Sequence, residues 1–565
     1  MRYHALVCDY DGTIAADGRV DAETAAALER VRESGRKLLL VTGRERDDLQ
    51  RVFDRLDLFD LVVVENGALL YRPDAQEERT LAEPPEERFV EALRERAVSP
   101  LSVGRVIVAT WEPNETTVLE VIRETGLELQ VIFNKGAVMV LPSGVSKASG
   151  LSAALRELGL SPHNAVGVGD AENDHAFLAL CECAVAVANA LPVLKDRCDL
   201  VTDGARGAGV AELVELLLAD DLASVAPRLE RHRLAVGDSD GGPLWIEPCG
   251  VNVLVAGPSG SGKSTFAMGF LERLAEAGYQ FCLIDPEGDY AVLEEGVVLG
   301  DAQHEPGPAE AAAALDDPEQ NVIVNLLGVA LEDRPRFFEA LLPRIVELRG
   351  RSGRPHWLVV DDAHHLLPAA WQPETLIAGE RFGGLLLITV HPESLAPGAL
   401  EATDVVVATG EEGPEALAQV ARARGRDAPR PESVEGEAIF WDVGGSNVQA
   451  FEILPSRFEH LRHTRKYAEG DLGPERSFYF RGPRGDQQLR AQNLMLFLQL
   501  ADGVNDETWL HHLHQGDYSR WLRESIKDDD LADEVARVEQ GDERPADEAR
   551  RLIRDAIESR YTSPA

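Results

Sequence analysis

The sequence predicts a multidomain α/β protein that ends in a mainly helical segment. At 565 residues the chain is too long for one hydrophobic core. Short apolar runs alternate with stretches of helical spacing from residue 1 to about 220, and a second alternation of this kind runs from about 245 to 455. After Pro455 the strand pattern stops. These observations predict two α/β domains followed by a mainly α C-terminal domain.

The first α/β region is expected to form a mainly parallel sheet flanked by helices. Its strand candidates are His4–Cys8, Leu38–Val41, Leu61–Val64 and Ala165–Val168. Helical spacing marks Ala22–Ser34 and Ser146–Leu158. Open sheets of this kind place their ligands at the carboxyl ends of the strands. Residues 1–66 and 144–220 are therefore predicted to form a Rossmann-like core.

Residues 67–143 interrupt that pattern. They contain a stretch rich in Pro and Glu (Pro73–Glu87), a helix, and strand candidates near Val103–Thr110, Leu129–Phe133 and Ala137–Leu141. An inserted α+β module explains this composition, and its place in the chain makes it a candidate lid over the sheet edge. Asn134 and Lys135 within it are candidates for substrate contact.

The second α/β region is predicted over residues 235–455. Asp238–Pro243 reads as a turn-rich linker before it. Its strand candidates are Val251–Ala256, Phe281–Asp285, Val322–Leu326, Trp357–Asp361, Leu385–Val390 and Val405–Ala408. Residues 456–565 are predicted to form a compact helical domain with an aromatic core.

The composition limits the classes of partner. No apolar run approaches the roughly 20 residues needed to cross a bilayer, and the first residues lack a signal-peptide pattern, so a cytoplasmic location is expected. The formal net charge is −42, and only seven of the 56 basic residues are lysine. Such a field repels nucleic acid at long range. The six cysteines show no zinc-site spacing and are expected to be reduced.

Carboxylates at predicted strand ends point to phosphate chemistry in the first region. Asp9 is placed to attack a phosphomonoester, and Asp11 to protonate the leaving oxygen and later activate water. Thr42 can bind phosphoryl oxygens, and Lys147 supplies a fixed cation. The residues predicted to hold Mg²⁺ are Asp9, Asp11, Asp170 and Asp174. Those predicted to bind substrate are Gly43, Arg44 and Asn173, with a surface ion pair as the alternative for Arg44.

These motifs resemble the haloacid dehalogenase superfamily of phosphohydrolases over residues 1 to about 218. The position of the insert between Thr42 and Lys147, and the run Glu65-Asn66-Gly67-Ala68, resemble the Cof-type branch with a C2 cap. The resemblance implies that Asp9 is the nucleophile and Asp11 the acid/base. It also implies a metal bound by Asp9, the Asp11 backbone and Asp170, and phosphatase rather than dehalogenase chemistry.

A second phosphate motif follows the strand candidate Val251–Ala256. The residues predicted to bind a nucleotide are Gly257, Ser259, Gly260, Ser261, Gly262, Lys263, Ser264 and Thr265. This P-loop spacing exposes backbone amides to phosphates, while Lys263 reaches the β and γ oxygens and Ser264 joins Mg²⁺. Asp361 supplies a metal-side carboxylate after a second strand, and Asp362 is a candidate base for hydrolysis.

The second region is similar to the HerA/FtsK-like ATPases. The similarity lies in Ile284–Tyr290, Asp361–His364 and Thr389–His391. Asp362 stands where that group has glutamate. Arg381 and Arg422 are candidates for an arginine finger. The resemblance implies a P-loop NTPase domain that takes ATP or GTP.

We therefore expect a Mg²⁺-dependent phosphatase that acts on a small phosphorylated metabolite, such as a sugar phosphate or a phosphoglycolate-like acid. An ATP-binding module would regulate or assemble it. Two alternatives stay open: a HerA-like nucleic-acid remodeller with an accessory phosphatase, and an ATP-gated regulator. The sequence also leaves homo-oligomer formation open.

Overall fold

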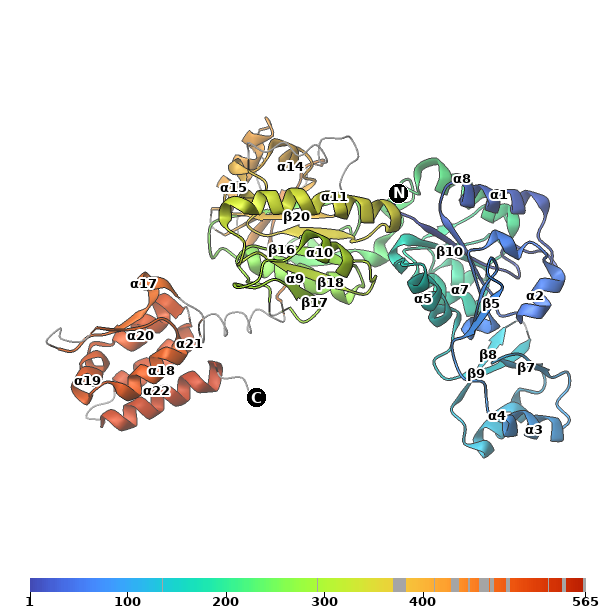
Figure 1. The fold of residues 1–565 in the computed structure, drawn as a ribbon, viewed down its shortest axis with the longest axis horizontal. Coiled ribbons are helices and arrows are strands. Elements are labelled where there is room, and N and C mark those ends of the chain that lie inside the picture. The colour runs from blue at the N-terminus through green and yellow to red at the C-terminus, as the bar shows by residue number, and fades with distance from the viewer. Residues whose placement is uncertain are drawn as a thin grey trace. The chain divides into compact units, whose positions relative to one another are not determined.

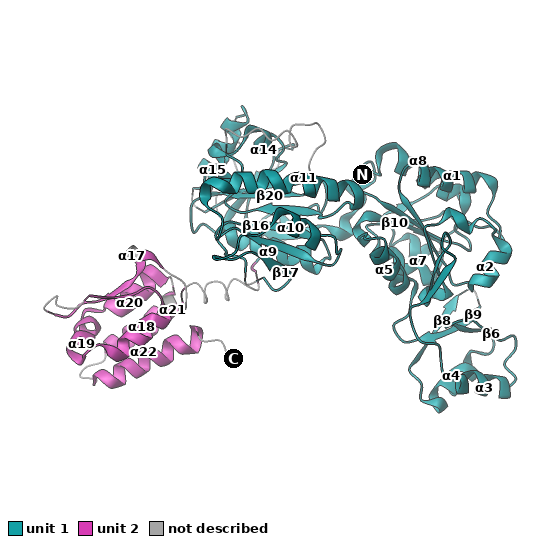
Figure 2. Ribbon diagram, viewed as in Figure 1, with its two compact units in different colours: residues 1–454 teal, residues 455–565 magenta. Residues whose placement is uncertain are grey.

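The computed structural model describes residues 1–565 except 135, 292, 369–382, 411, 428–435, 446–447, 457–466, 468–471, 484–487, 527, 541–544 and 562–565. Figure 1 shows its elements. The chain divides into two compact units, residues 1–454 and residues 455–565 (Figure 2). Among the described residues, no helix combines the length and the apolar character that crossing a membrane requires.

Unit 1 begins with an N-terminal lobe, residues 1–233, built on an eight-stranded sheet of order β12-β11-β10-β1-β2-β3-β4-β5. Its strands are β1 (Ala5–Asp9), β2 (Lys37–Val41), β3 (Leu61–Val64), β4 (Leu69–Arg72), β5 (Glu77–Thr80), β10 (Ala165–Gly169), β11 (Cys183–Ala186) and β12 (Leu200–Val201). The strands from β12 to β3 are parallel, and β4 and β5 are antiparallel. The parallel sheet expected from the sequence is confirmed.

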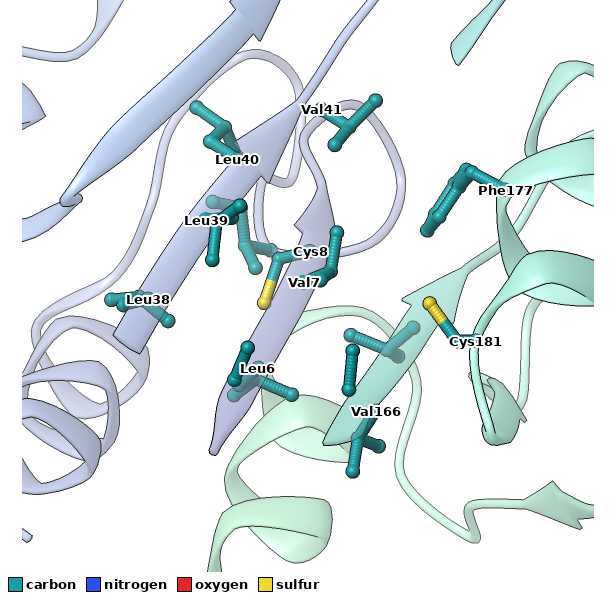
Figure 3. Packing of buried hydrophobic residues seen from close by; sticks show 14 of the residues in the cluster. Leu6, Val7, Cys8, Leu38, Leu39, Leu40, Val41, Val166, Phe177 and Cys181 are labelled. Atoms are coloured by element: carbon teal, nitrogen blue, oxygen red, sulfur yellow. The ribbon is translucent and has the colours of Figure 1, made fainter. Parts of the chain in front are cut away.

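Helices cover this sheet and close the core of the lobe. They are α1 (Ala22–Glu33), α2 (Arg46–Val52), α5 (Lys147–Glu157), α6 (His175–Leu180), α7 (Pro192–Lys195) and α8 (Gly207–Asp220). Every residue of β1 is buried, because the strand is apolar on both faces and lies between two parallel neighbours. Figure 3 shows its side chains packed between β2 and β10, with Phe177 and Cys181 beside β10.

The inserted segment forms a smaller sheet of order β6-β7-β9-β8. Its elements are α3 (Glu87–Glu95), β6 (Ser102–Val103), β7 (Val108–Trp111), α4 (Glu115–Thr125), β8 (Leu129–Asn134) and β9 (Ala137–Pro142). Phe89, Val118 and Val140 belong to its separate hydrophobic core. The expected α+β composition is confirmed, although β4 and β5 continue the main sheet instead of joining the insert.

The second lobe, residues 234–454, holds an eleven-stranded sheet of order β14-β13-β23-β22-β21-β15-β20-β19-β16-β18-β17. Its strands are β13 (Leu234–Ser239), β14 (Gly242–Ile246), β15 (Asn252–Ala256), β16 (Phe281–Asp285), β17 (Gly296–Leu299), β18 (Asn321–Asn325), β19 (Trp357–Val360), β20 (Leu385–Thr389), β21 (Val405–Thr409), β22 (Ala438–Asp442) and β23 (Val448–Ile453). Its helices are α9 (Lys263–Glu276), α10 (Pro308–Ala314), α11 (Arg334–Ser352), α12 (Ala363–Leu366), α14 (Pro397–Glu401) and α15 (Gly413–Ala423). The six predicted strands are confirmed.

The expectation of a linker at Asp238–Pro243 is wrong. These residues form the turn and flanking strand ends of a hairpin, in which Ser239 pairs with Gly242. Strand β13 also pairs with β23, since Gly237 lies opposite Ile453. Turn-forming residues therefore mark a tight reversal within the sheet instead of a break between domains.

The described residues of unit 2 form helices and one hairpin. Its helices are α17 (Gly473–Arg476), α18 (Leu494–Gly503), α19 (Asp506–Gln515), α20 (Asp517–Trp521), α21 (Asp529–Glu539) and α22 (Ala546–Tyr561), with a π-helical turn at Leu522–Ile526. The strand pattern does not stop at Pro455, because β24 (Phe478–Phe480) and β25 (Leu489–Ala491) form a hairpin. Phe478, Trp509 and Tyr518 pack in its aromatic core.

Candidate functional site

Three neighbouring parallel strands bring the first set of predicted residues to one sheet edge. Strand β1 pairs with β10 on one side and with β2 on the other. Asp9 ends β1, Thr42 follows β2 and Asp170 follows β10. All three side chains are buried. Residues more than 150 positions apart therefore converge because parallel strands end at the same edge.

Lys147 joins the carboxylates of this cluster. Its Nζ donates to Asp9 Oδ1 at 2.5 Å and to Asp174 Oδ1 at 2.6 Å. The lysine is the first residue of α5, where a positive charge is unfavourable against the helix dipole. The two carboxylates offset that cost. The Lys147 side chain is 2% exposed, so its charge is held in a fixed position at the sheet edge.

The charges in the cluster shift one another's proton affinities. Burial raises the pKa of the Asp9 carboxyl, and the charge of Asp174 raises it further, while Lys147 acts in the opposite direction. Burial alone would lower the pKa of Lys147, but the charges of Asp174 and Asp9 outweigh it and raise that pKa. Lys147 is therefore a permanent cation in this site.

Asp9, Asp170 and Asp174 form an acidic cluster suited to a hard cation. One carboxylate oxygen from each lies within 4.8 Å of the others, and all three residues are buried. Asp174 Oδ2 accepts the backbone N–H groups of Asp170 and Ala171, both at 2.9 Å. Asp174 thus orients the loop of Asp170 in addition to pairing with Lys147. Buried carboxylate oxygens at this spacing are the donor set that Mg²⁺ prefers.

The loop after β1 fits closely around this cluster. Gly12 has φ +91°, and a Cβ atom there would lie 2.2 Å from Asp170 Oδ2, so only glycine fits. Thr13 Oγ1 donates to Asp9 Oδ2 at 3.1 Å. Asn189 Nδ2 donates to the Gly12 carbonyl at 2.8 Å. Asn189 was not predicted, because it follows β11 without a motif around it.

Arg44 binds Asp11 through two hydrogen bonds. Arg44 Nε donates to Asp11 Oδ2 at 2.6 Å, and Nη2 donates to Asp11 Oδ1 at 2.7 Å. Nη1 donates to Asp48 at 2.5 Å. The ion-pair alternative for Arg44 therefore describes its contacts in this structure. These two hydrogen bonds also fix the plane of the Asp11 carboxylate.

The turn Glu65–Gly67 braces the site from the side. Its three residues all have positive φ, and a Cβ atom on Gly67 would lie 1.9 Å from the Ser146 carbonyl oxygen. The Asn66 N–H donates to the Thr42 carbonyl at 3.0 Å. Glu65 accepts the N–H groups of Val106 and Ile107 in the inserted segment. One turn thus holds the Thr42 loop, the start of α5 and the insert together.

Two of the predicted substrate residues, Gly43 and Asn173, lie beside the insert. Asn173 Nδ2 donates to Asn66 Oδ1 at 3.3 Å. A Cβ atom on Gly43 would lie 3.6 Å from the sulfur of Met139 on β9, and 3.9 Å from Asn173. Gly43, Asn173 and a side chain of the insert therefore meet at one place. Lys135, the neighbour of Asn134, lies outside the described residues.

The segment predicted to be a P-loop lies between β15 and α9 in the second lobe. Gly260 and Gly262 have φ of +80° and +97°, which a Cβ atom would oppose. Lys263 Nζ donates to the Pro258 carbonyl at 2.7 Å, so the lysine folds back over its own loop. Burial lowers the pKa of Lys263, and the charges of Asp361 and Asp362 act in the opposite direction. The loop, the lysine and the two carboxylates therefore share one site.

Strand order places a polar residue between the P-loop and these carboxylates. Strand β20 pairs with β15 on one side and with β19 on the other. Thr389, at the end of β20, lies 3.1 Å through Oγ1 from His364 Nδ1. Burial, with the charges of His365 and His391, lowers the pKa of His364 to about 4. Asp362 has φ +42°, an uncommon conformation for aspartate.

A cavity of about 520 Å³ opens beside the P-loop. Its lining includes Gly257, Ser259, His391, Glu393 and Glu415. Arg422, a candidate arginine finger, donates to Glu415 at 2.7 Å on the exposed face of α15. Arg381 lies outside the described residues.

Comparison with known proteins relates the N-terminal lobe to hydrolases. The sequence pattern of the haloacid dehalogenase-like hydrolases matches residues 6–105 and 113–214. Phosphoglycolate phosphatase 2 of Saccharolobus solfataricus is 29% identical over 219 residues, which cover 38% of this chain and 92% of that protein. The phosphoglycolate phosphatase of Methanothermobacter thermautotrophicus is 31% identical over 219 residues, covering 37% of this chain and 96% of that protein. A solved haloacid dehalogenase-like hydrolase from Bacteroides thetaiotaomicron is 20% identical, with a TM-score of 0.34, over 38% of this chain and 99% of its own.

Proposed function

The chain belongs to the haloacid dehalogenase-like hydrolases through its N-terminal lobe, and we propose that this lobe is a Mg²⁺-dependent phosphatase that forms an aspartyl-phosphate on Asp9. The substrate is a small phosphorylated metabolite. The observation that carries this proposal is the buried ammonium of Lys147 between Asp9 and Asp174, at the edge where Asp170 also lies. A phosphate dianion needs a fixed cation and a nucleophile close together.

The residues divide the reaction between them. An Asp9 oxygen attacks phosphorus, a new O–P bond forms, and the bond to the leaving oxygen breaks. Asp11 gives its proton to that oxygen and then takes one from the water that cleaves the aspartyl-phosphate. Lys147 stabilises the negative charge that builds on the phosphoryl oxygens. Thr42 and the backbone of Gly43 face the same edge and are proposed to bind the phosphoryl group.

Asp9, Asp170 and the Asp11 backbone are the groups proposed to hold Mg²⁺. The acidic cluster fits this ion because its donors are carboxylate oxygens within 4.8 Å of one another. When bound, the ion supplies positive charge that screens the repulsion between Asp9 and the phosphate. Asp174 is proposed to orient this cluster, because both its oxygens already bind Lys147 and the Asp170 loop.

The inserted segment supports a small substrate. Met139 of the insert lies beside Gly43, and Glu65 binds the backbone of the insert, so this module lies against the loop that is proposed to bind the phosphoryl group. The curated relatives of the lobe are named phosphoglycolate phosphatases. A phosphoglycolate-like acid is therefore our first choice of substrate, and a sugar phosphate is the second.

Replacing the nucleophile tests this assignment. Turnover of p-nitrophenyl phosphate and of 2-phosphoglycolate should require Mg²⁺, and Asp9→Asn should reduce it by at least about 1000-fold. Asp17→Asn is the matched control, because Asp17 is exposed and has φ +50°, which asparagine also tolerates. Undiminished turnover in Asp9→Asn with a native circular dichroism spectrum would falsify the assignment.

We further propose that the P-loop of the second lobe binds ATP or GTP and regulates or assembles the phosphatase. Gly257–Thr265 carry the P-loop pattern, and Ser264 and Asp361 are the proposed metal-side groups. Helix α9 begins at Lys263 and ends beside Ala277, whose carbonyl accepts a hydrogen bond from His163 at 2.8 Å. His163 lies two residues before β10, the strand that leads to Asp170. This continuous connection between the two sites supports regulation.

A screen of phosphorylated metabolites with and without ATP tests this second proposal. ATP should change turnover in the wild type and leave Lys263→Ala unaffected. Lys37→Ala, a half-exposed lysine paired with Asp60, should behave as the wild type. An ATP effect that persists in Lys263→Ala, together with lost binding of a fluorescent ATP analogue, would exclude the P-loop as its source.

One observation favours hydrolysis by the second lobe. Thr389 and His364 connect the end of β20 to the turn that carries Asp362, the proposed base. A nucleic-acid remodeller would use such a site, and its ATP hydrolysis would rise when DNA is added. A rate that DNA does not change would leave the regulatory function as the better account.

A further inference from the structure

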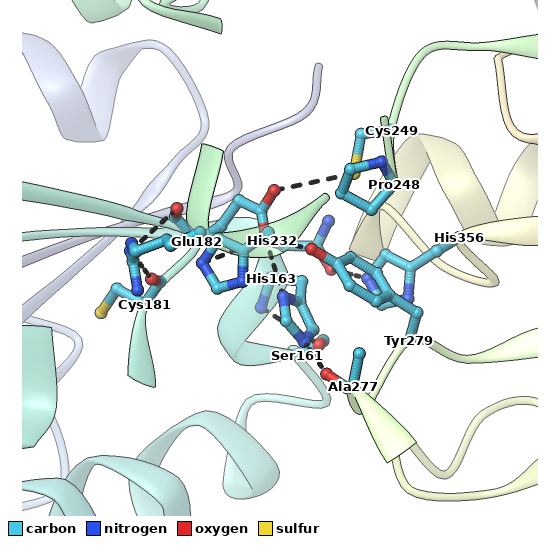
Figure 4. Close-up of polar contacts among 12 residues, drawn as sticks. Ser161, His163, Cys181, Glu182, His232, Pro248, Cys249, Ala277, Tyr279 and His356 are labelled. Atoms are coloured by element: carbon cyan, nitrogen blue, oxygen red, sulfur yellow. Dashed lines mark hydrogen bonds and ion pairs between the residues drawn. The ribbon is translucent and has the colours of Figure 1, made fainter. Parts of the chain in front are cut away.

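A buried polar cluster lies where the two lobes of unit 1 meet (Figure 4). His163 comes from the turn Pro162–Asn164 before β10, and Glu182 comes immediately before β11. His232 ends the turn Glu230–His232, which connects the lobes. The second lobe contributes Ala277 and Tyr279, which follow α9. None of these residues has a role in the proposed phosphatase reaction.

Three ligand-type atoms converge in this cluster. His163 Nδ1 lies 2.7 Å from Glu182 Oε2, and His232 Nε2 lies 3.9 Å from the same oxygen. One donor atom from each of the three residues falls within 4.8 Å of the others. Ligand atoms bound at about 2.0–2.1 Å to a tetrahedral zinc ion are about 3.4 Å apart. The distances from His163 Nδ1 and His232 Nε2 to Glu182 Oε2 therefore each differ from the zinc geometry by less than about 1 Å.

His232 provides the independent sign of a ligand. Its Nε2 atom is buried and has no hydrogen-bond partner among the described residues. A neutral imidazole keeps a lone pair on one nitrogen, which can bind a cation. A buried ring nitrogen without a partner is costly. A cation placed between this atom and the Glu182 carboxylate would satisfy it.

The surroundings orient the other two residues as ligands. His163 Nε2 donates to the Ala277 carbonyl at 2.8 Å, which leaves Nδ1 directed at Glu182. A metal-bound histidine usually makes such a second hydrogen bond. Tyr279 Oη donates to Glu182 Oε2 at 2.7 Å, and Arg2 Nη2 donates to Oε1 at 2.6 Å. Cys249 Sγ lies 4.0 Å from Oε1.

The same contacts also allow a metal-free arrangement. Burial alone would raise the pKa of Glu182, but the hydrogen bond and charge of His163, with Arg2 and His232, hold it well below its usual range. If His163 carries protons on both nitrogens, it donates to Glu182 and to Ala277 at once, and the carboxylate is neutralised. That arrangement leaves His232 Nε2 without a hydrogen-bond partner in the described part of the chain.

We propose that His163, Glu182 and His232 bind one zinc ion at the junction of the two lobes. Two imidazole nitrogens and one carboxylate oxygen suit Zn²⁺ better than Mg²⁺, which prefers oxygen donors alone. A cavity of about 600 Å³ is lined by His163 and His232 and can supply a water molecule as the fourth ligand. The ion replaces a proton on His163 Nδ1 and ties the N-terminal lobe to the connecting turn. The site is independent of the proposed phosphatase reaction.

Zinc retention by the full chain tests the proposal. The protein is stripped with a chelator, loaded with Zn²⁺ in excess Mg²⁺ to occupy the oxygen-donor sites, and desalted before its zinc is measured. The wild type should retain one more equivalent than His232→Ala, with an affinity at least about 100-fold higher. His304→Ala, which removes an exposed histidine paired with Asp301, should retain the wild-type amount. Asp170→Asn should also retain the wild-type amount of zinc, because Asp170 belongs to the acidic cluster and not to the proposed zinc site.

Each other outcome overturns the proposal. If the wild type retains no zinc, the cluster is an ion pair only. If Asp170→Asn loses the equivalent while His232→Ala keeps it, the zinc was bound by the acidic cluster. His232→Gln repeats the test with a polar side chain in case the alanine variant unfolds. Should both fail to fold, wild-type protein loaded with Co²⁺ decides, since a four-coordinate site with two imidazoles gives strong visible absorption and a six-coordinate oxygen site does not.

Discussion

Asp11 has a partner in the structure that the sequence did not predict. Sequence reasoning made Arg44 a substrate ligand or a surface ion pair, and the structure has it bound to both oxygens of Asp11. A side chain that must give and take a proton in the proposed reaction depends on orientation, because proton transfer requires hydrogen-bond reach. Arg44 is therefore better described as the residue that positions Asp11.

Removing this arginine should impair turnover more than substrate binding. In Arg44→Ala the Asp11 carboxylate loses both fixed hydrogen bonds, and we expect kcat to fall by about 10- to 100-fold with KM changed little. Steady-state kinetics on p-nitrophenyl phosphate measure both constants. Arg51→Ala is the control, since Arg51 is exposed and its guanidinium binds Asp48 and the Asp47 carbonyl. A rise in KM at constant kcat would instead assign Arg44 to the substrate.

At the scale of elements, the N-terminal end of α5 positions Lys147. Ser146 caps this helix, because its Oγ accepts a hydrogen bond from the Ser149 N–H at 3.2 Å. In turn, Ser149 Oγ accepts a hydrogen bond from the Ser146 N–H. Lys147 follows immediately. The cap sets the direction in which the Lys147 side chain leaves the helix. Gly67 packs closely against the Ser146 carbonyl, since a Cβ atom on Gly67 would lie 1.9 Å from that oxygen.

Loss of this cap should affect both stability and turnover. Ser146→Ala removes the capping oxygen, and we expect the free energy of unfolding to fall by about 1 kcal/mol. The catalytic rate should fall several-fold because Lys147 is held less firmly. Denaturant unfolding and steady-state kinetics measure the two effects. Ser152→Ala, on the exposed side of the same helix, should change neither, and equal effects in both variants would contradict a capping role.

At the scale of the whole molecule, unit 1 joins its lobes through buried polar contacts. Arg354 of the second lobe is 1% exposed and donates through Nη2 to the Gly159 carbonyl of the N-terminal lobe at 2.7 Å. Its Nη1 donates to Gln280 Oε1 at 2.8 Å. His356 accepts the Gln280 N–H on Nδ1 and directs Nε2 at Asn164 Oδ1. Such a junction favours a fixed arrangement of the lobes.

Truncating Arg354 should loosen this junction. In Arg354→Ala several buried carbonyl groups lose a charged donor, and we expect a loss of about 3 kcal/mol in unfolding free energy. Calorimetry of the full chain should show a lower transition temperature for unit 1. Arg351→Ala, an exposed neighbour that pairs with Asp316, should leave that temperature unchanged. A wild-type transition in Arg354→Ala would show that the lobes are held by other contacts.

Unit 2 should fold without the rest of the chain. Among the described residues, its hydrophobic core is formed by positions between Tyr467 and Tyr561, and Trp509 and Trp521 belong to it. A fragment of residues 455–565 is expected to unfold cooperatively, with one midpoint by circular dichroism and tryptophan fluorescence. Non-coincident midpoints would mean that the core is incomplete in isolation.

Local patterns predicted the strands and much of the two phosphate motifs. Asp9 ends an apolar run that the sequence marks as a strand. Lys263 follows a glycine-rich segment that comes directly after another such run. The hairpin of β13 and β14 was missed because its turn residues also suit a linker. Asn189 was missed because it lies in no motif, and only its contact with Gly12 reveals it.

The sequence by itself determined which residues stand at strand ends, because backbone periodicity and turn chemistry are local. It thereby determined where the acidic motif and the P-loop pattern lie, and the order of the α/β regions. Only the tertiary structure decided the partners of those residues: Lys147 between Asp9 and Asp174, Arg44 on Asp11, and His163 with Glu182 and His232. These contacts join positions far apart in the chain, and parallel strand packing and the lobe junction bring them together.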